Sequence, residues 1–148
     1  MSPQQPAGTA KPGRQAREPT VGMTVTHRRY VPYSHAHYAG NLVDGAYSLA
    51  GFGDVATEMC IRTDGDEGLF ASYSDVQFRA PVRAGDCIEI EATLVRVGSR
   101  SREMSFEVRV IARGNPAGGV SSQSSADLLA EPVIATTARG VVVVPSTT

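Results

Sequence analysis

The sequence predicts an α+β fold in which an antiparallel sheet wraps around one long central helix. Three observations predict it: a single long helical stretch at residues 41–62, strand-like segments on both sides of it, and short turns between most of the later strands. A chain of 148 residues, 41% of them hydrophobic and 20% charged, is long enough for one domain with a core and too short for two.

The N-terminal part of the chain is expected to be a tail that precedes the domain. Residues 1–22 are rich in Pro, Gln, Gly, Ala and Ser and lack apolar periodicity, which is typical of a disordered segment. The domain is expected to span residues 23–145. Within it, residues 24–31 read as a strand and residues 32–40 as a loop that leads into the helix.

Turn residues at 63–66 end the helix, and four strands are expected after it. Alternation of apolar and polar residues is clearest in the second and third of these strands, which a hairpin turn at 98–101 connects. A flexible loop from 114 to about 125 separates the last two. The four strands are predicted at residues 69–78, 87–97, 102–113 and 132–144.

This order of elements is the hotdog arrangement, and it leaves one edge of the sheet free. Pairing of that edge with a second copy would remove an aggregation hazard, so we expect a homodimer or a higher oligomer with active sites at the subunit interface. Cys60 and Cys87 have no motif spacing and lie among apolar residues, so both are expected to be free thiols in the interior.

Charge and hydropathy exclude several classes of function. The formal net charge of −1 gives no basic excess for binding nucleic acid. No apolar run approaches the roughly 20 residues that span a bilayer, and the N-terminus lacks the apolar stretch of a signal peptide, so a cytoplasmic protein without membrane association is expected. His35 and His37 have no third ligand nearby, so no metal site is expected.

The predicted helix is more polar than a core helix should be. Its apolar face is expected to carry Leu49, Phe52, Ala56, Met59 and Cys60, together with Ala46 and Ala50. The opposite side gathers Asp44, Tyr47, Ser48, Gly51, Asp54 and Glu58, with Val55 among them. This polar side is either a solvated surface or a functional face near a subunit boundary, where carboxylates need partners or a role.

The loop before the helix favours the functional interpretation, although a surface loop would also account for each histidine alone. His35 and His37 lie two residues apart, and histidine is the side chain best suited to move protons near neutral pH. The helix start at Asp44-Gly45 offers free N–H groups and the positive end of the helix dipole. A thioester carbonyl held there would have its developing negative charge stabilised.

Two motifs carry a family resemblance. Residues 36–46 (AHYAGNLVDGA) and 53–58 (GDVATE) resemble the β-alanyl-CoA and 3-aminobutyryl-CoA ammonia lyases of the hotdog superfamily. The similarity continues through residues 64–66 and 69–70 and through the Phe78-x-Ala80-Pro81-Val82-x-x-Gly85-Asp86 segment, which acyl-CoA thioesterases share. It covers roughly residues 24–113. The resemblance implies addition or elimination of an amine at the β-carbon of an unsaturated or 3-aminoacyl thioester.

The resemblance also implies roles for residues of these motifs. His37 with Asp54 or Glu58, from one subunit or two, is expected to transfer protons. The hairpin turn is similar to the turn that contacts the cofactor in acyl-CoA thioesterases. Substrate-binding residues are expected at Tyr38, Asn41, Asp44, Gly45 and Tyr47, and coenzyme A contacts at Arg83, Ser99 and Arg100. No separate cofactor is expected, because coenzyme A or the phosphopantetheine arm of an acyl carrier protein is part of the substrate.

Two other functions stay open at this stage. Hotdog thioesterases commonly place an acid seven residues after the glycine at the helix start, and here that position is Phe52, with Asp54 two residues later. A thioesterase that uses His37 to activate water, alone or after addition of an amine such as glycine, is therefore the alternative. A binding protein for acyl thioesters without catalysis is the third hypothesis.

Overall fold

The computed structural model describes residues 18–117 and 122–145. Most of the expected tail, residues 1–17, lies outside the described residues. The end of the expected tail forms a turn against the sheet, where the N–H of Gly22 donates to the carbonyl of Leu94 at 2.8 Å.

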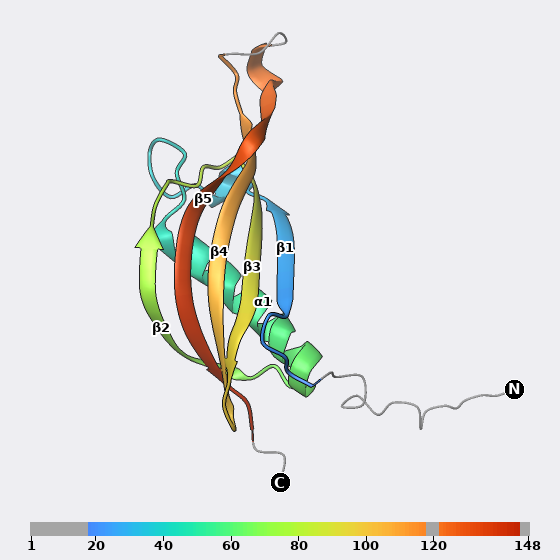
Figure 1. Cartoon of the computed structure of the whole chain (residues 1–148). Coiled ribbons are helices and arrows are strands. Elements are labelled where there is room, and N and C mark those ends of the chain that lie inside the picture. The colour runs from blue at the N-terminus through green and yellow to red at the C-terminus, as the bar shows by residue number, and fades with distance from the viewer. Residues whose placement is uncertain (1–17, 118–121, 146–148) are drawn as a thin grey trace, which may run out of the picture.

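Five antiparallel strands form one sheet, and a single long helix lies across one of its faces (Figure 1). The elements in chain order are β1 (Thr24–Tyr30), the 3₁₀ turn η3 (Tyr33–His35), α1 (Gly45–Asp64), β2 (Leu69–Phe78), β3 (Cys87–Val97), β4 (Ser101–Gly114), the 3₁₀ turn η4 (Ser122–Ser124) and β5 (Ala126–Val143). The strand order is β1-β3-β4-β5-β2, so β1 and β2 are the two edges. The predicted α+β fold with one central helix is confirmed.

The core lies between α1 and the sheet, and β3 and β4 supply many of its side chains. Alternate residues of β3 and β4 are buried, as the sequence pattern predicts for strands with one solvated face. Phe52 of α1 is fully buried and stacks on Phe106 of β4 with 5.0 Å between ring centroids. Burial of each large apolar side chain contributes about 1.5–3 kcal/mol, which fixes α1 on the sheet.

The start of α1 corrects the prediction. The helix begins at Gly45, not at 41, and runs to Asp64. Asn41 has a φ of 64°, which breaks helical geometry, and Asp44 caps the helix by accepting a hydrogen bond from the N–H of Tyr47 at 3.2 Å. Gly65, in the left-handed region at φ 66°, ends it.

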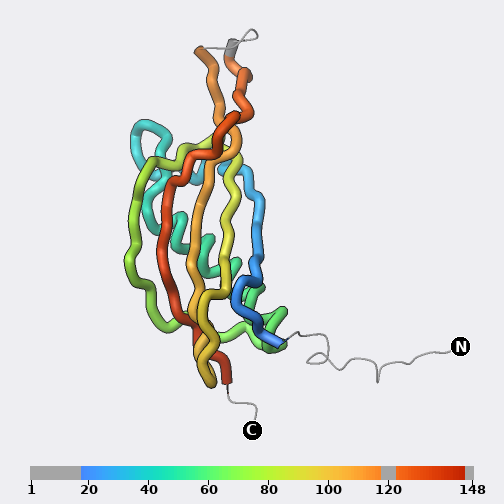
Figure 2. The backbone as a smooth tube through the Cα atoms, viewed as in Figure 1, coloured from blue at the N-terminus to red at the C-terminus, as the bar shows by residue number. Residues whose placement is uncertain are grey.

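The buried face of α1 also differs from the expected one. Ser48, Gly51 and Val55 are buried, whereas Ala46 and Ala50 are exposed. The backbone tube shows α1 crossing the strands at an angle (Figure 2), so that the sheet contacts a wider arc of the helix than its apolar stripe. Gly51 permits this contact, because a Cβ there would lie 2.6 Å from Cδ1 of Ile90.

The last strand is longer than predicted. β5 begins at Ala126 and not at Pro132, and its pairing with β4 shifts between the Val110–Val133 and Ala112–Leu128 partners. Pro132 lies within this irregular stretch, where the missing N–H removes no ladder hydrogen bond. The last residues of β4 and the first residues of β5 form an arm that projects beyond the rest of the sheet (Figure 1). Of the expected loop at 114–125, residues 118–121 lie outside the described residues.

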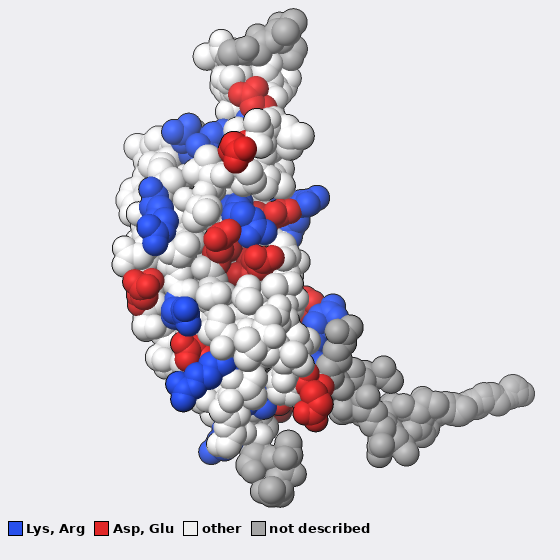
Figure 3. All heavy atoms as spheres, viewed as in Figure 1, with Lys and Arg blue, Asp and Glu red and all other residues white. Residues whose placement is uncertain are grey.

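The outer face of the sheet carries interspersed charges (Figure 3). Arg109 contacts Glu89 and Glu91 at 3.2 Å and Glu107 at 2.9 Å, and Arg28 contacts Glu89 at 2.6 Å. Such partly exposed pairs each contribute little to stability, and they keep this face polar.

Both cysteines are free thiols, but only one is in the interior. Cys60 is fully buried, and burial raises the pKa of its thiol to about 11. Cys87 is only half-buried, because it shares the outer face of β3 with Glu89 and Glu91, whereas the alternate residue Ile88 is buried. Among the described residues, no helix combines the length and hydropathy that crossing a membrane requires.

Candidate active site

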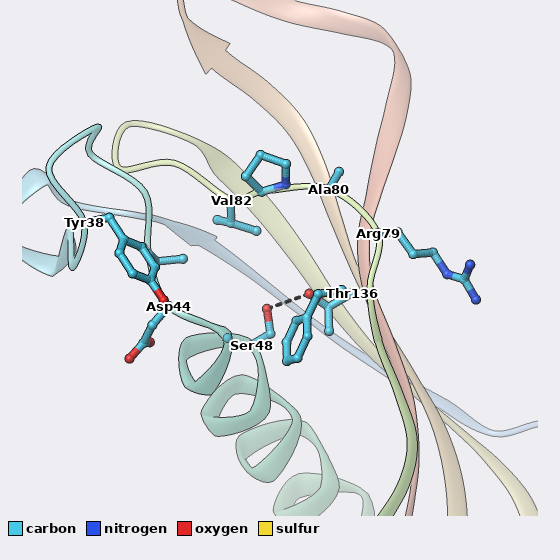
Figure 4. Close-up of a pocket in the computed structure, with 11 residues that line it drawn as sticks. Tyr38, Asp44, Ser48, Arg79, Ala80, Val82 and Thr136 are labelled. Carbon is cyan, nitrogen blue, oxygen red and sulfur yellow. Dashed lines mark hydrogen bonds between the residues drawn. The ribbon is translucent and has the colours of Figure 1, made fainter.

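A cavity of about 430 Å³ lies at the first turn of α1, beside the end of β2 (Figure 4). Three segments form it: the loop before α1 with the first turn of the helix, the segment after β2, and β5. Its lining residues are Tyr38, Val43, Asp44, Gly45, Ser48, Phe78, Arg79, Ala80, Pro81, Val82 and Thr136.

Asp44 joins the helix start to the histidine loop. One carboxylate oxygen, Oδ1, caps the helix through the N–H of Tyr47, and the other, Oδ2, lies 3.8 Å from Nδ1 of His37. The ring of Tyr38 packs edge-on against that of His37, with 4.6 Å between centroids. The N–H groups of the first helical turn and the positive end of the helix dipole face the same region. A side chain of the type that can transfer protons therefore lies beside backbone N–H groups of the type that can stabilise negative charge.

The wall after β2 is held rigidly. The N–H groups of Arg79 and Ala80 donate to the carbonyl of Ala135 at 2.7 and 3.1 Å, and the N–H of Val43 donates to the carbonyl of Val82 at 3.0 Å. Asn41 takes part through its backbone, since its carbonyl accepts from the N–H of Ala84 at 2.8 Å. These bonds fix the distance between the wall and the helix start.

Gly45 is required by a neighbouring ring. A Cβ at this position would lie 2.6 Å from Cζ of Phe78, so the ring covers the helix start only because residue 45 has no side chain. We expected Gly45 to allow a ligand to approach the backbone. The Phe78 ring occupies the side of Gly45 where a Cβ would lie, and both residues line the same cavity, so the approach of a ligand to this backbone stays a prediction.

The expected catalytic carboxylates lie elsewhere on α1. Asp54 pairs with Arg29 of β1 at 3.0 Å, and Glu58 pairs with His27 of β1 at 2.7 Å. Asp54 and Glu58 follow Asp44 by ten and fourteen residues, which is about 15 and 21 Å along a helix. One protomer therefore does not bring His37 together with Asp54 or Glu58.

Glu58 is held by two bases. The hydrogen bond with His27, and then that from Arg62 at 2.8 Å, keep the pKa of the Glu58 carboxyl below its usual value. Tyr47, expected in the substrate site, instead bonds through its hydroxyl to Nδ1 of His35 at 2.8 Å. These contacts connect the β1 side of α1 to the strand and loop.

Sequence reasoning missed His27 and Arg29 as partners of the helix. The signal was available, because His27 and Arg29 follow the buried Val25 by two and four residues along β1 and so lie on the same face of the strand. It also missed the cavity residues Ser48, Phe78 and Thr136, which are brought together from distant parts of the chain.

The expected coenzyme A contacts lie at opposite ends of the sheet. Arg83 follows the cavity wall, whereas Ser99 and Arg100 form the turn between β3 and β4. The eleven residues of β3 lie between them, which at about 3.3 Å per residue is roughly 36 Å. A second cavity, of about 610 Å³, lies beside Arg100 and is lined by Gly65, Asp66, Glu67, Gly68, Leu69, Val143, Val144 and Pro145.

Comparison with known proteins identifies the family. Residues 40–116 match the model of the thioesterase superfamily. The chain is 49% identical over 112 residues to the 3-aminobutyryl-CoA ammonia lyase of Acetoanaerobium sticklandii, an alignment that covers 74% of this chain and 85% of the relative. The chain belongs to the acyl-CoA ammonia lyase family of the thioesterase superfamily.

Solved structures agree with this family assignment. The β-alanyl-CoA:ammonia lyase of Clostridium propionicum matches with a TM-score of 0.77 and 35% identity, over 84% of this chain and 87% of that one. A hexameric hotdog-fold thioesterase of Campylobacter jejuni matches with a TM-score of 0.65 and 19% identity, over 81% of each chain, and at that identity it supports the hotdog fold alone. Among residues 18–117 and 122–145, no group of three His, Cys, Asp or Glu side chains is arranged to hold a metal ion.

Proposed function

We propose that this protein catalyses the reversible elimination of ammonia from a 3-aminoacyl thioester of coenzyme A, which yields the α,β-unsaturated thioester. The observation that carries the proposal is the 49% identity to a 3-aminobutyryl-CoA ammonia lyase over 74% of this chain and 85% of the relative. Coenzyme A thioesters are metabolites of the cell interior, which is also our ground for proposing a cytoplasmic location.

The helix start and the histidine supply what the reaction needs. A thioester carbonyl that accepts a hydrogen bond from an N–H of the first turn of α1 acidifies the α-carbon. The substrate carries its 3-amine as ammonium. His37 takes the α-proton, the electron pair of the C–H bond forms the C=C bond, and the C–N bond breaks with its electron pair on nitrogen. Ammonia leaves and takes up the proton that His37 carries, so the products are the enoyl thioester and ammonium.

Asp44 is the carboxylate that we propose as the partner of His37. Its Oδ2 lies 3.8 Å from His37 Nδ1, so it can orient the ring and stabilise its charged form. Asp54 and Glu58 point toward β1, where Arg29 and His27 bind them at 3.0 and 2.7 Å. We therefore propose that these two carboxylates support the fold of α1 and that Tyr38, at the cavity edge, contacts the substrate.

The open edge of β2 is where we propose that two protomers pair. Its ends carry exposed apolar side chains, with Leu69 80% and Phe78 59% exposed. Antiparallel pairing of β2 with its copy would bury both and would cover an unpaired strand edge. It would also place the Phe78 end of each strand beside the Leu69 end of the partner.

Such a dimer reconciles the two expected coenzyme A contacts. The cavity at Phe78 in one protomer would adjoin the partner's cavity at Leu69, which Arg100 lines. Arg83 of one protomer and the partner subunit's Arg100 could then flank one cofactor, whose phosphates suit guanidinium groups. We propose that each active site is shared in this way.

Hydrolysis is less well supported than elimination. Phe52, at the position where related thioesterases carry an acid, is fully buried and stacks on Phe106. A carboxylate could not replace it there without the cost of burying a charge. Thioester hydrolysis, alone or after amine addition, is therefore an outcome that the following experiment separates from the proposed reaction.

The test is incubation with crotonyl-CoA and either ammonia or glycine, followed by mass spectrometry of acyl products and free thiol. We expect an ammonia adduct that remains on the thioester, and the reverse reaction from 3-aminobutyryl-CoA. Free crotonate or a released amino acid would identify a thioesterase or a dual enzyme. Absence of any adduct with crotonyl-CoA and with its carrier-protein thioester would overturn the proposal.

A further inference from the structure

The cavity contains a pair of buried hydroxyl groups. Ser48 of α1 and Thr136 of β5 are 4% and 2% exposed, and their Oγ and Oγ1 atoms lie 3.0 Å apart. Figure 4 shows the two side chains pointing toward one another between the helix and the strand, below the segment that carries Ala80 and Val82. Val43, Phe78 and Val82 line the same cavity. Buried hydroxyls in an apolar setting cost free energy unless their hydrogen-bonding capacity is used.

This pair has unused hydrogen-bonding capacity that faces the cavity. Each hydroxyl has one O–H donor and two acceptor lone pairs, and their mutual bond uses one donor and one lone pair. One O–H and three lone pairs remain. Among the residues that the structure describes, neither hydroxyl makes another hydrogen bond. A ligand with several N–H donors would match this set.

The position of the pair matches the amine of a 3-aminoacyl group. Ser48 follows Gly45 by three residues, so it lies about 4.5 Å further along the helix and close to the same face. In the substrate, two C–C bonds and one C–N bond of about 1.5 Å each separate the carbonyl carbon from the amine nitrogen, a span of up to about 4 Å. A thioester carbonyl bound at the helix start therefore places its 3-amine beside Ser48.

We propose that the Ser48–Thr136 hydroxyl pair is the amine subsite, which accepts hydrogen bonds from the 3-ammonium group of the substrate and selects 3-aminoacyl thioesters over those without an amine. The assignment rests on the proposed function and deepens it. Neutral hydroxyls suit this role because a carboxylate would form a stronger, charge-assisted bond to ammonium and so oppose its departure as ammonia. The pair also binds ammonia for the reverse reaction.

The experiment compares ligands with and without the amine. Thr136→Val and Ser48→Ala each remove one hydroxyl. We expect each variant to raise KM for 3-aminobutyryl-CoA, and KM for ammonia in the reverse direction, about tenfold, while the inhibition constant of butyryl-CoA changes less than about twofold. Thr136→Ser keeps the hydroxyl and should behave as the unaltered protein, which also covers the case in which Thr136→Val does not fold.

Thr63→Val is the matched control. Thr63 is a buried threonine of α1, 4% exposed, and its hydroxyl lies within hydrogen-bond distance of Oδ2 of Asp64 at 2.7 Å and of the carbonyl of Met59 at 3.1 Å, both outside the cavity. It should leave both KM values and the inhibition constant unchanged. A parallel rise of the butyryl-CoA constant in Thr136→Val would mean that the pair only shapes the cavity, and selective loss of thioester hydrolysis would mean that it holds a water. Either result overturns the assignment, whereas an unaltered protein without ammonia exchange would instead overturn the proposed function.

Discussion

Arg113 holds the fully buried carboxylate of Asp86 with two hydrogen bonds, from Nε to Oδ1 at 2.8 Å and from Nη2 to Oδ2 at 2.9 Å. Oδ2 also accepts from the N–H of Arg83, and Nη2 of Arg113 reaches the carbonyl of Pro81 at 3.1 Å. The end of β4 is thereby tied to the segment that forms the cavity wall. The two bonds between the Arg113 guanidinium and the Asp86 carboxylate join opposite charges in a bidentate geometry, which is among the strongest hydrogen-bonding arrangements of a carboxylate in proteins.

Loss of Arg113 should destabilise the protein. Arg113→Met leaves the Asp86 carboxylate buried without its counter-charge, and we expect a loss of roughly 3 kcal/mol in the free energy of unfolding. The added change Asp86→Asn removes the charge and keeps an acceptor for the N–H of Arg83, so the double variant should recover more than half of the loss. Urea unfolding of both variants measures this. A double variant as unstable as Arg113→Met would show that the charge is not the cause.

The ion pair between Asp64 and Arg102 should make stability depend on acid. Burial acts to raise the pKa of Asp64, but hydrogen bonds from Arg102 and Thr63 and the charge of Arg102 outweigh it, so this pKa lies below its usual value. The folded protein therefore binds fewer protons here than the unfolded chain. The stabilising contribution is complete above the unfolded value of about 4 and is lost as the pH falls through the folded value.

Arg102→Met tests this dependence. The substitution removes the hydrogen bonds and the charge that lower the pKa, so the fall in stability between about pH 4 and pH 2 should become shallower than in the unaltered protein. Thermal unfolding across pH 2–7 measures the slope. An equal slope in both proteins would assign the acid sensitivity to other carboxylates, of which Glu58 and Glu89 also have lowered pKa values.

Replacement of two glycines by alanine should change the free energy of unfolding in opposite directions. At Gly140 of β5 a Cβ would lie 2.5 Å from Cζ of Phe70 and 2.8 Å from Cε2 of Phe106, so Gly140→Ala should cost about 1–3 kcal/mol through overpacking. At Gly53 of α1 nothing lies within 4 Å, so Gly53→Ala should stabilise the helix by about 0.5–1 kcal/mol. Urea unfolding measures both, and a stabilised Gly140→Ala protein would show that the aromatic cluster can move.

Mixed dimers should test whether the active site is shared. His37→Ala should lower kcat about 10²–10⁴-fold, and Arg100→Ala should raise KM for coenzyme A thioesters about tenfold through weaker binding. A dimer of one protomer of each variant then contains one site with both residues intact and one with neither. At substrate concentrations below KM we expect co-purified mixed dimers to approach half of the unaltered activity per dimer.

The control for this experiment is His35→Ala. His35 lies in the same loop but bonds to Tyr47, whereas His37 faces the cavity residue Asp44, so the loss of His35 should change kcat less than tenfold. If mixed dimers are no more active than the average of the two parent variants, each site lies within a single protomer.

The sequence was informative wherever structure follows from local pattern. Alternation in 87–97 and 102–113 predicted β3 and β4, because one face of each strand packs on α1. The predicted helix start at residue 41 was wrong. Asn41 has a left-handed backbone and Asp44 caps the helix, so the helix begins only at Gly45. The predicted start of the last strand at Pro132 is wrong, because a strand can pass through a proline where its pairing is irregular.

The candidate site was only partly predictable for a similar reason. Tyr38, Asp44 and Gly45 lie within a few residues of one another, so the motif itself placed them at the cavity. A catalytic role of Asp54 and Glu58 stays a prediction. Within one protomer their partners Arg29 and His27 come from β1, and a helix pattern alone does not identify partners across a sheet. Thr136 lies 88 residues from Ser48, and no local pattern connects them.

The strand order also determines when the site can form during synthesis of the chain. β2 is made early, but among the described strands it pairs only with β5, and β5 supplies Thr136. While the ribosome translates β3 and β4, the nascent chain carries β2 with neither edge paired and the helix with only part of its binding surface. Strands β1, β3 and β4 can already form a three-stranded sheet at that point. Addition of β5 then completes the sheet and the cavity in one event, so we expect activity to appear only after translation has passed Val143.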